Sequence, residues 1–453
     1  MKKRDFLLVV FLLFYAAISS QIVVFQKSYN LSGHQEAKDI IAISDEEFFI
    51  AGQTKNNQDI DNILIMKLDD MGDTIWTKTY CGDSISYAQK IIHTSDDNYL
   101  IAGGMMEKPF LLKINSEGDS LWSMSFPCEY ECGFKDVIQL PNSDLILIKW
   151  IFTTPLSSQI LRIDSSGNID WIKDVVFDDF RDIKLFSDNE FLLSGWEGWA
   201  FSPNVFLRKY DISGNLIFYK QFLDFYGQNK CLDISDQNIF LGCGKDISGN
   251  YNPSIIKTDF QGNSEIWFDL TGIPTWWVEA MIIVDNDYII TGSEDHFNNE
   301  IYITALNLDG EIIGSVDFEF TFPIVNAVKN VNEFLYVTGN MTGNNGIDIF
   351  LVKLNIDSLL VNIDEMEKSS VFNPLIFPNP ARNKIFIEIP SEIFEKNIKI
   401  VLWNNSGQKI IRPIRIEENI IEIPVKGLNK GVYFISLSIP KHPVITKKIV
   451  IAR

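Results

Sequence analysis

The hydrophobic positions of this chain group into short runs of four to six residues, separated by clusters of Asp, Asn, Ser and Gly. Short runs between turn-forming residues are typical of β-strands, because an amphipathic helix needs a longer segment. One unit has such runs at residues 90–93, 99–103, 110–114 and 121–126. Its first three runs are apolar on both faces and its fourth alternates, which predicts three inner strands and one half-exposed outer strand.

A short polar element follows the third run of each unit and recurs seven times, at a spacing of about 46–49 residues. It reads Asp or Asn, two variable residues, Gly, then Asp, Asn or Glu, with an aromatic residue a few positions later in most copies. The central positions are Gly72, Gly118, Gly167, Gly214, Gly262, Gly310 and a degenerate Ser358. Periods of about 40–50 residues built from short strands indicate a β-propeller. The sequence therefore predicts an all-β protein with a seven-bladed propeller of four-stranded blades.

The recurrent element is interpreted as a hairpin loop. Its leading Asp can accept hydrogen bonds from loop N–H groups, and its Gly tolerates the positive φ of a tight turn. Calcium binding is the alternative, but one or two carboxylates per loop fall short of the roughly six to eight oxygen ligands that this ion takes.

The two ends of the repeat array match each other. Residues 25–29 resemble residues 76–80 position for position, whereas the seventh unit lacks both the Gly and the aromatic residue. We therefore expect the N-terminal strand to complete the seventh blade. Such closure removes an exposed sheet edge.

Residues 1–20 have the composition of a secretory signal peptide: Lys2, Lys3 and Arg4 precede an apolar run at 6–18 and small residues at 19–20. No later segment approaches the ~20 apolar residues of a membrane span. We expect the propeller to occupy residues 21–356, a polar linker 357–371 and a separate C-terminal domain 372–453.

The C-terminal segment contains Pro-Asn-Pro-Ala at 378–381, Asn-x-Ser-Gly-Gln-Lys at 404–409, Leu-x-x-Gly-Val-Tyr-Phe at 428–434 and a basic last strand. In these motifs it resembles the type A C-terminal sorting domain of proteins that Bacteroidota export through the type IX secretion system. The resemblance implies a small immunoglobulin-like β-sandwich that the secretion machinery recognises at the outer membrane. It also implies removal of the domain during export and a mature protein that is released or attached to the cell surface. The sorting-signal residues would be Pro378, Asn379, Pro380, Gly407, Gly431, Tyr433, Lys447 and Lys448.

Composition narrows the function further. The 39 basic and 60 acidic residues give a net charge of −21, which argues against nucleic-acid binding. Cys128 and Cys132 favour a local disulfide or free thiols over a metal site, and Cys231 with Cys243 form a second potential pair. Catalytic nucleophile and phosphate-binding motifs are missing, so no cofactor and no metal are predicted.

Alignment of the repeats identifies one set of equivalent positions that carry mostly charged residues. Each lies thirteen residues before the Gly near the end of the second run, or before Lys149 in the third unit, which has no Gly there. We expect these residues near the start of the innermost strands, around one mouth of the central channel. Four carboxylates and one Lys would form a negative funnel for a cation, water or a basic ligand group, or a polar plug of internal ion pairs. The ring consists of Asp39, Lys90, Asp136, Asp182, Cys231, Glu279 and Asn326.

Loops on the same face carry Trp196, Trp199, Trp276 and Trp277. An exposed Trp can stack on a sugar, whereas a buried one packs between blades. Trp276 and Trp277 join Asp39, Lys90, Asp136, Asp182 and Glu279 as candidate ligand-binding residues.

Three functions are compatible with these features, and a non-enzymatic one is favoured. The leading hypothesis is a secreted or cell-surface binding module for a protein or glycan. The alternative is an extracellular propeller-fold polysaccharide hydrolase or lyase that draws an acid and a base from Asp136, Asp182 and Glu279. A structural role in a surface layer or gliding apparatus stays open.

Overall fold

The computed structural model contains two compact units, residues 1–360 and 361–453. It describes residues 22–31, 33–56, 58–153, 157–176, 178–198, 204–222, 229–247, 250–263, 265–270, 273–295, 298–343, 346–360, 375–378, 380–388, 399–404, 409–410, 415–417, 420–438 and 445–452. Within these ranges, no helix has the length and apolar character needed to cross a membrane.

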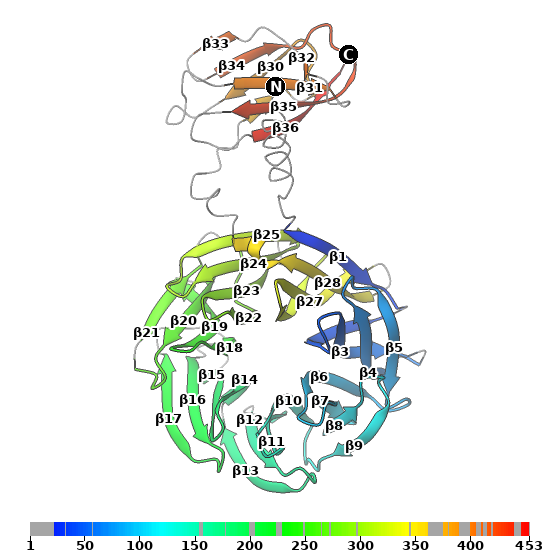
Figure 1. Cartoon of the computed structure of the whole chain (residues 1–453), viewed down its shortest axis with the longest axis vertical. Helices are drawn as coiled ribbons and strands as arrows, with labels where there is room; N and C mark the ends of the chain where they lie inside the picture. Colours follow the sequence, from blue (N-terminus) through cyan, green and yellow to red (C-terminus); the bar gives the residue numbers. More distant parts are fainter. Residues whose placement is uncertain are drawn as a thin grey trace, which may run out of the picture. The chain divides into compact units, whose positions relative to one another are not determined.

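The first unit is a ring of seven four-stranded antiparallel sheets, each of which forms one blade around a central channel (Figure 1). This arrangement confirms the predicted seven-bladed propeller. The innermost strands are β2 Gln35–Ala42, β6 Ser86–His93, β10 Cys132–Gln139, β14 Asp178–Ser187, β18 Asn229–Ile234, β22 Ala280–Val284 and β26 Ile324–Val331. The second strands are β3 Glu47–Lys55, β7 Tyr99–Met105, β11 Leu145–Ile151, β15 Glu190–Glu197, β19 Ile239–Ile247, β23 Tyr288–Asp295 and β27 Phe334–Gly343.

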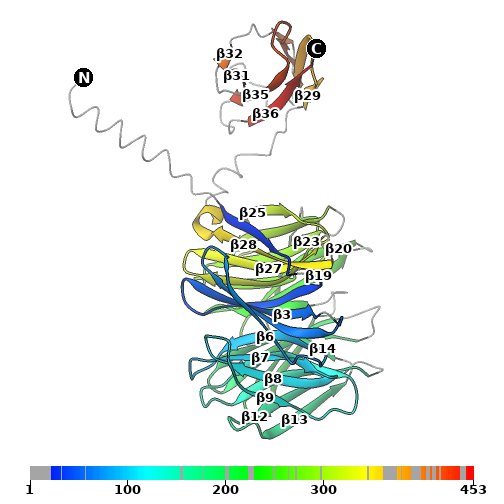
Figure 2. The ribbon, with the colours of Figure 1, turned by 90° about the vertical axis from the view of Figure 1, so that its right-hand side faces the viewer.

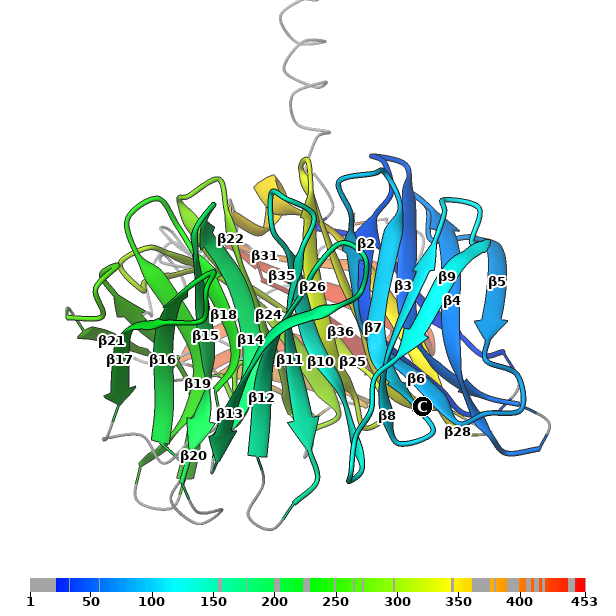
Figure 3. The ribbon, with the colours of Figure 1, turned by 90° about the horizontal axis from the view of Figure 1, so that it is seen from below.

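The outer half of each blade contains a third and a fourth strand. The third strands are β4 Asp61–Asp69, β8 Lys108–Ile114, β12 Ser157–Ile163, β16 Asn204–Asp211, β20 Asn250–Thr258, β24 Glu300–Asn307 and β28 Gly346–Asn355. The outermost strands are β5 Thr74–Tyr80, β9 Ser120–Ser125, β13 Ile169–Val176, β17 Leu216–Phe222, β21 Glu265–Asp269, β25 Ile312–Glu319 and β1 Val23–Tyr29. Seen along the ring, the strands run between two faces that carry the connecting loops (Figure 3).

The N-terminal strand closes the ring as predicted. Strand β1, blue in Figures 1 and 2, pairs antiparallel with β28 from the other end of the propeller, with Gln26 opposite Val352. The seventh blade therefore combines one strand from the start of the array with three from its end. The hydrogen-bonded ladder ties the two ends together and covers the edge of β28.

Burial follows the position of a strand within its blade. The second and third strands are buried on both faces, as in β4, where all residues except the two terminal ones are buried. The outer strands are largely exposed, as in β5. The inner strands alternate instead of being buried on both faces as expected, because one of their faces points toward the channel.

The apolar core of the ring lies between blades. Seven hydrophobic clusters among the described residues each combine side chains of two neighbouring blades; Phe48 of the first blade and Tyr336 of the seventh belong to one of them. Packing continues past β28, because Leu359 is fully buried in the cluster of the last two blades. No blade buries its faces alone, so each seam between blades holds the structure together.

The second unit contains two four-stranded sheets, ordered β29-β30-β34-β33 and β32-β31-β35-β36. One apolar cluster, which includes Ile387, Ile435 and Ile449, contains residues of both sheets, consistent with the expected small β-sandwich. The strands are β29 Leu375–Phe377, β30 Lys384–Glu388, β31 Lys399–Asn404, β32 Lys409–Ile410, β33 Arg415–Glu417, β34 Ile420–Pro424, β35 Gly431–Ser438 and β36 Ile445–Ile451.

The expected sorting-signal residues lie at different places in this unit. Pro378 and Pro380 are exposed after β29. Gly431 begins β35, and the buried Tyr433 donates a hydrogen bond from its hydroxyl to the Asn429 carbonyl at 2.9 Å. Lys447 and Lys448 belong to β36. Asn379 and Gly407 lie outside the described residues.

Candidate functional site

The central channel holds a polar cavity of about 190 Å³, which we call the channel site. Its charged lining consists of Lys38, Asp39, Lys90, Lys135, Asp136, Arg181, Asp182, Lys184, Lys230 and Glu279. These are six basic and four acidic side chains, whereas the sequence predicted four carboxylates and a single Lys. The ring residues also lie further along the strands than expected: Asp39, Lys90 and Asp136 are each the fifth residue of an eight-residue inner strand.

A β-bulge near the middle of the inner strand explains how additional basic residues reach the channel. In the first blade the pairing with the second strand shifts between Ala37 and Asp39, so Lys38 has no partner opposite it. The same shift occurs in five further blades. A bulge turns an extra side chain toward the face that the regular strand does not use. The residues at this position are Lys38, Gln89, Lys135, Arg181, Lys230 and Asn326.

Asn326, which was assigned to the ring, belongs to this bulge position, and Glu279 directly precedes the inner strand of the sixth blade. Asn326 lies between Val325 and Ala327, which both pair with residues of the second strand. The Glu279 N–H donates to the carbonyl of Gly292, and Gly292 is also the residue that pairs with Ala280. In the sixth and seventh blades, counting thirteen residues back from the Gly of the second strand goes one residue too far. Ala280 and Ala327 precede Gly292 and Gly339 by only twelve residues. The ring position is therefore held by Asp39, Lys90, Asp136, Asp182, Cys231, Ala280 and Ala327.

The ring carboxylates connect neighbouring blades. Asp39 accepts a hydrogen bond from the Ile91 N–H of the next blade at 3.1 Å and from its own neighbour Ile40 at 3.0 Å. Asp136 accepts one from the Ile183 N–H at 3.1 Å. Asp182 accepts one from the Leu232 N–H at 2.8 Å. Each of these carboxylates satisfies backbone donors of an inner strand, which gives it a structural role in the ring.

The basic side chains pair with carboxylates around the channel. Lys90 lies 3.4 Å from Asp39, and Lys230 lies 3.0 Å from Glu279. Lys135 and Arg181, in contrast, both pair with the same carboxylate, Asp179. Internal ion pairing is thus extensive, as the polar-plug alternative expects, but one acidic group serves two cations.

The pKa values reflect this uneven pairing. Burial, together with the neighbouring Arg181 and Lys230, lowers the pKa of Lys135 to about 8 despite its contact with Asp179. Burial and the nearby Asp182 carboxylate raise the pKa of Asp136 well above its usual range. The Asp39 carboxylate raises the pKa of Lys90. The Lys135 ammonium is buried beside two other cations, so an additional negative charge next to it would favour its charged form.

The Trp residues divide into two groups. Trp196 is buried and pairs with Asp179 across the fourth blade, so it packs. Trp277 lies next to the channel site, with its ring 5.5 Å from the Lys230 ammonium, and Trp276 packs edge-on against it and is 39% exposed. Trp199 lies outside the described residues.

The cysteines do not assemble a metal site within the described ranges, where no group of three or more His, Cys, Asp and Glu is suited to hold an ion. Cys128 and Cys132 form a disulfide, the local pairing that their spacing favours. Cys231 and Cys243 are buried free thiols, so the second potential pair is not formed. Burial raises the pKa of both thiols, which makes them poor nucleophiles.

Comparison with known protein families identifies the C-terminal unit. Residues 375–452 match the family described as "Secretion system C-terminal sorting domain". The chain therefore carries an export signal of the type IX secretion system, and the protein is secreted or exported to the cell surface. No curated protein sequence matches the chain.

Solved structures resemble the propeller only in its fold. A puromycin hydrolase S511A mutant complexed with PGG has a TM-score of 0.51 at 10% identity, and the match covers 79% of this chain and 59% of the hydrolase. Semaphorin 2a from Drosophila has a TM-score of 0.49 at 9% identity, with 95% and 98% covered. A PL25 ulvan lyase has a TM-score of 0.47 at 8% identity, with 73% and 96% covered. At 10% identity, the likeness to the puromycin hydrolase concerns the fold alone and carries no activity over to this chain.

Proposed function

We propose that this protein is an exported binding module whose channel site recognises an acidic group of an extracellular glycan or protein. The observation that carries the proposal is the pairing of Lys135 and Arg181 with the single carboxylate of Asp179. A guanidinium beside an ammonium is a suitable receptor for a carboxylate or sulfate, because the guanidinium can bind such an anion through two parallel hydrogen bonds. The neighbouring Trp276 and Trp277 would add an aromatic surface to the same ligand site.

Acidic oligosaccharides test this proposal directly. Calorimetric titration of the full chain with alginate and heparin fragments should show saturable binding, whereas uncharged maltohexaose should not bind at the channel site. Arg181→Gln should weaken the binding of the acidic fragments at least tenfold, while Lys108→Gln at an exposed position of β8 serves as the matched control. Equal affinity of the wild type and Arg181→Gln would disprove the assignment.

The lowered pKa of Lys135 predicts how this affinity depends on pH. An anion binds the protonated amine, so affinity should be full below pH 8 and fall as pH rises through about 8. Asp179 and Arg181 of β14 and Lys230 of β18 face the same amine. Constant affinity across this interval would exclude Lys135 from the site.

An extracellular hydrolase or lyase is the second candidate, and one contact favours it. The Asp136 side chain interacts with that of Asp182, and the raised pKa of Asp136 leaves a proton on this pair near neutral pH. Two carboxyl groups that share a proton can serve as acid and base. A screen on polysaccharides would decide between the two functions: turnover that Asp182→Asn abolishes establishes an enzyme, and saturable binding without turnover rejects it.

For the ends of the chain, we propose that residues 1–20 are removed as a signal peptide in a bacterium of the Bacteroidota. We further propose that the sorting domain is cleaved off and that the mature propeller is released or attached to the cell surface. Deletion of residues 372–453 should keep the protein inside the cell. Normal amounts of the truncated protein in the medium would contradict this role of the domain.

A further inference from the structure

The seams between blades are sealed by a recurrent set of contacts. The loop between the third and fourth strands of one blade packs on the outer strand of the preceding blade. At the seam between the first two blades, the Tyr80 hydroxyl donates to the Gly118 carbonyl at 2.7 Å and the Lys78 ammonium to the Glu117 carbonyl at 2.6 Å. Gly118 lies directly on Trp76, so that a Cβ there would be 2.4 Å from the indole. The loop is thus held by an ammonium, a hydroxyl and an aromatic ring.

The closing seam of the ring repeats this arrangement. The Tyr29 hydroxyl donates to the Gly72 carbonyl at 2.7 Å, and the Lys27 ammonium contacts Asp73 at 2.6 Å. Phe25 takes the place of the Trp beneath the loop glycine. An aromatic residue, then Lys, then Tyr at alternate positions of the outer strand is therefore a sealing motif, since alternate residues of a strand lie on one face.

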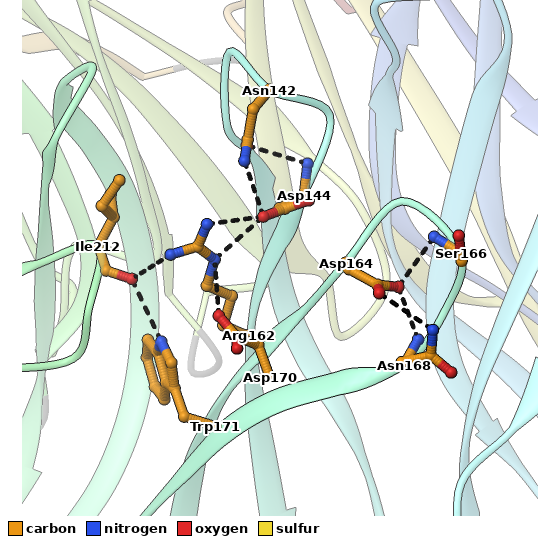
Figure 4. A network of polar contacts seen from close by, with 9 residues as sticks. All are labelled: Asn142, Asp144, Arg162, Asp164, Ser166, Asn168, Asp170, Trp171 and Ile212. Atoms are coloured by element: carbon orange, nitrogen blue, oxygen red, sulfur yellow. Dashed lines mark hydrogen bonds and ion pairs between the residues drawn. The ribbon is translucent and has the colours of Figure 1, made fainter.

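The seam between the third and fourth blades is sealed from the third strand (Figure 4). The Arg162 guanidinium of β12 donates to the Ile212 carbonyl of the next blade at 2.9 Å and pairs with Asp144 at 2.7 Å. The Trp171 indole N–H donates to the same carbonyl at 3.2 Å.

The seam between the second and third blades lacks both kinds of seal. Met124 and Phe126 occupy the positions of the Lys and the Tyr, and neither side chain can donate a hydrogen bond to the next loop. Lys113, at the position of Arg162, instead contacts Asp96 of its own blade at 2.7 Å. Trp122 is 40% exposed, and it lies more than 4 Å from the Cβ position of Gly167, the glycine that should cover it.

A cavity of about 370 Å³ occupies this seam, which we call the seam cavity. Its apolar lining consists of Leu100, Leu111, Trp122, Met124, Leu145 and Ile163. Its hydroxyl groups come from Thr94, Ser95, Ser123, Ser143, Ser165 and Ser166. Two hydrogen bonds hold the adjacent turns together: the Ser95 N–H donates to the Gln139 side chain at 2.7 Å, and the Ser95 and Ser143 hydroxyls are 3.1 Å apart. The walls of the cavity are thus braced although the seal is missing.

The charged groups of the seam cavity are engaged within the protein. Lys113 pairs with Asp96. Burial alone would raise the pKa of Asp96, but its hydrogen bonds with Lys113 and Thr94 hold this pKa well below its usual range. Asp164 accepts hydrogen bonds from the backbone N–H groups of Ser166 and Asn168 at 2.9 and 2.8 Å (Figure 4). A charged ligand would have to displace these partners, whereas neutral hydroxyls line the rest of the cavity.

We propose that the seam cavity binds a neutral sugar unit of a glycan. The exposed indole of Trp122 offers an apolar face for the ring C–H groups, and the hydroxyls of the turns can bond to those of the sugar. The volume lies at the lower end of the roughly 300–1,000 Å³ range of small-molecule sites and suits one or two sugar rings. This site is separate from the channel site, so either can fail without the other.

The proposal is tested by measuring sugar binding before and after the sealing motif is introduced into the seam between the second and third blades. Methyl glycosides of glucose, galactose and mannose, with maltose and cellobiose, are titrated into the full chain while Trp fluorescence and saturation-transfer NMR are recorded. At least one neutral sugar should bind saturably. Trp122→Ala and the double change Met124→Lys with Phe126→Tyr should each weaken that binding at least tenfold, and Arg181→Gln at the channel site should leave it unchanged.

The double change separates loss of the site from loss of the fold, because it installs the residues that two other blades carry and should raise the melting temperature. Three outcomes overturn the proposal: binding of no neutral sugar, sugar binding that survives the double change, or binding only of an apolar probe such as toluene. Failure of acidic oligosaccharides to bind would leave this proposal intact and reject only the channel site.

Discussion

The seam between the third and fourth blades and the seam between the second and third are built from the same repeat, yet one is sealed and the other open. In the sealed seam, Arg162 reaches across to the Ile212 carbonyl. In the open seam, the equivalent Lys113 turns back to Asp96. The outer strand cannot replace the missing contact there, since Met124 and Phe126 stand where Lys and Tyr seal other seams. A repeat protein thus acquires a pocket by omitting contacts that its other repeats make.

The largest effect is expected from opening the sealed seam. Arg162→Met removes the bond of the guanidinium to the Ile212 carbonyl of the next blade and leaves the largely buried Asp144 without its cationic partner. Breaking such a pair lowers the free energy of unfolding by about 3–5 kcal/mol. Urea unfolding of the full chain would measure the loss. A change below 1 kcal/mol would show that Arg162 does not hold the seam.

A matched pair of glycines should come second. Gly118 and Gly167 have positive φ angles of 74° and 88°, so an Ala is strained at both positions by about 1–2 kcal/mol. The new Cβ of Gly118→Ala would meet the rigid Trp76 ring, whereas that of Gly167→Ala would meet the flexible end of Met124. We expect Gly118→Ala to be the more destabilising by a further 1–3 kcal/mol or so in urea unfolding. Equal losses would contradict the looser packing of the open seam.

Closing the open seam should stabilise the protein. The double change Met124→Lys and Phe126→Tyr supplies two donors to the loop around Gly167, and each hydrogen bond contributes about 1 kcal/mol. The melting temperature of the full chain should rise accordingly. Each single change serves as a control and should give about half of the gain. Destabilisation by the double change would mean that the loop cannot approach the outer strand.

The smallest effect is expected for the counterpart of the first change. Lys113→Met removes an ion pair whose acidic partner, Asp96, is half-exposed and can be hydrated. Because no contact to the next blade is lost, the free energy of unfolding should fall by about 1 kcal/mol or less. Urea unfolding beside Arg162→Met provides the comparison. Similar losses for the two variants would remove the distinction between the seams.

The channel site shows where sequence reasoning succeeded and where it stopped. Counting back from the glycines found five equivalent positions of the inner strands, although they lie further along the strands than expected: Asp39, Lys90, Asp136, Asp182 and Cys231. It misplaced Glu279 and Asn326, because Ala280 and Ala327 precede the glycine by one residue fewer. The basic residues at the bulge were missed altogether. A bulge is defined by which residues of two strands lie opposite each other, so it can be recognised only when the pairing of the strands is known.

The seam cavity was also missed, although its signal was present in the sequence. The match between residues 25–29 and 76–80 contains the sealing motif, and Met124 and Phe126 depart from it visibly. The consequence of these substitutions becomes clear only from the structure, in which the Tyr29 and Tyr80 hydroxyls donate hydrogen bonds across a seam. A difference between repeats is uninformative until the contact that it removes is known.

The sequence by itself determined the repeat, the seven blades, the closure by the N-terminal strand and the nature of the C-terminal domain. These properties follow from the periodicity of strands and turns and from local motifs, which depend on near neighbours along the chain. Only the tertiary structure decided the charge of the channel site and the opening between the second and third blades. Both depend on side chains about fifty residues apart that meet across a seam, and their pairing is settled by packing rather than by local sequence.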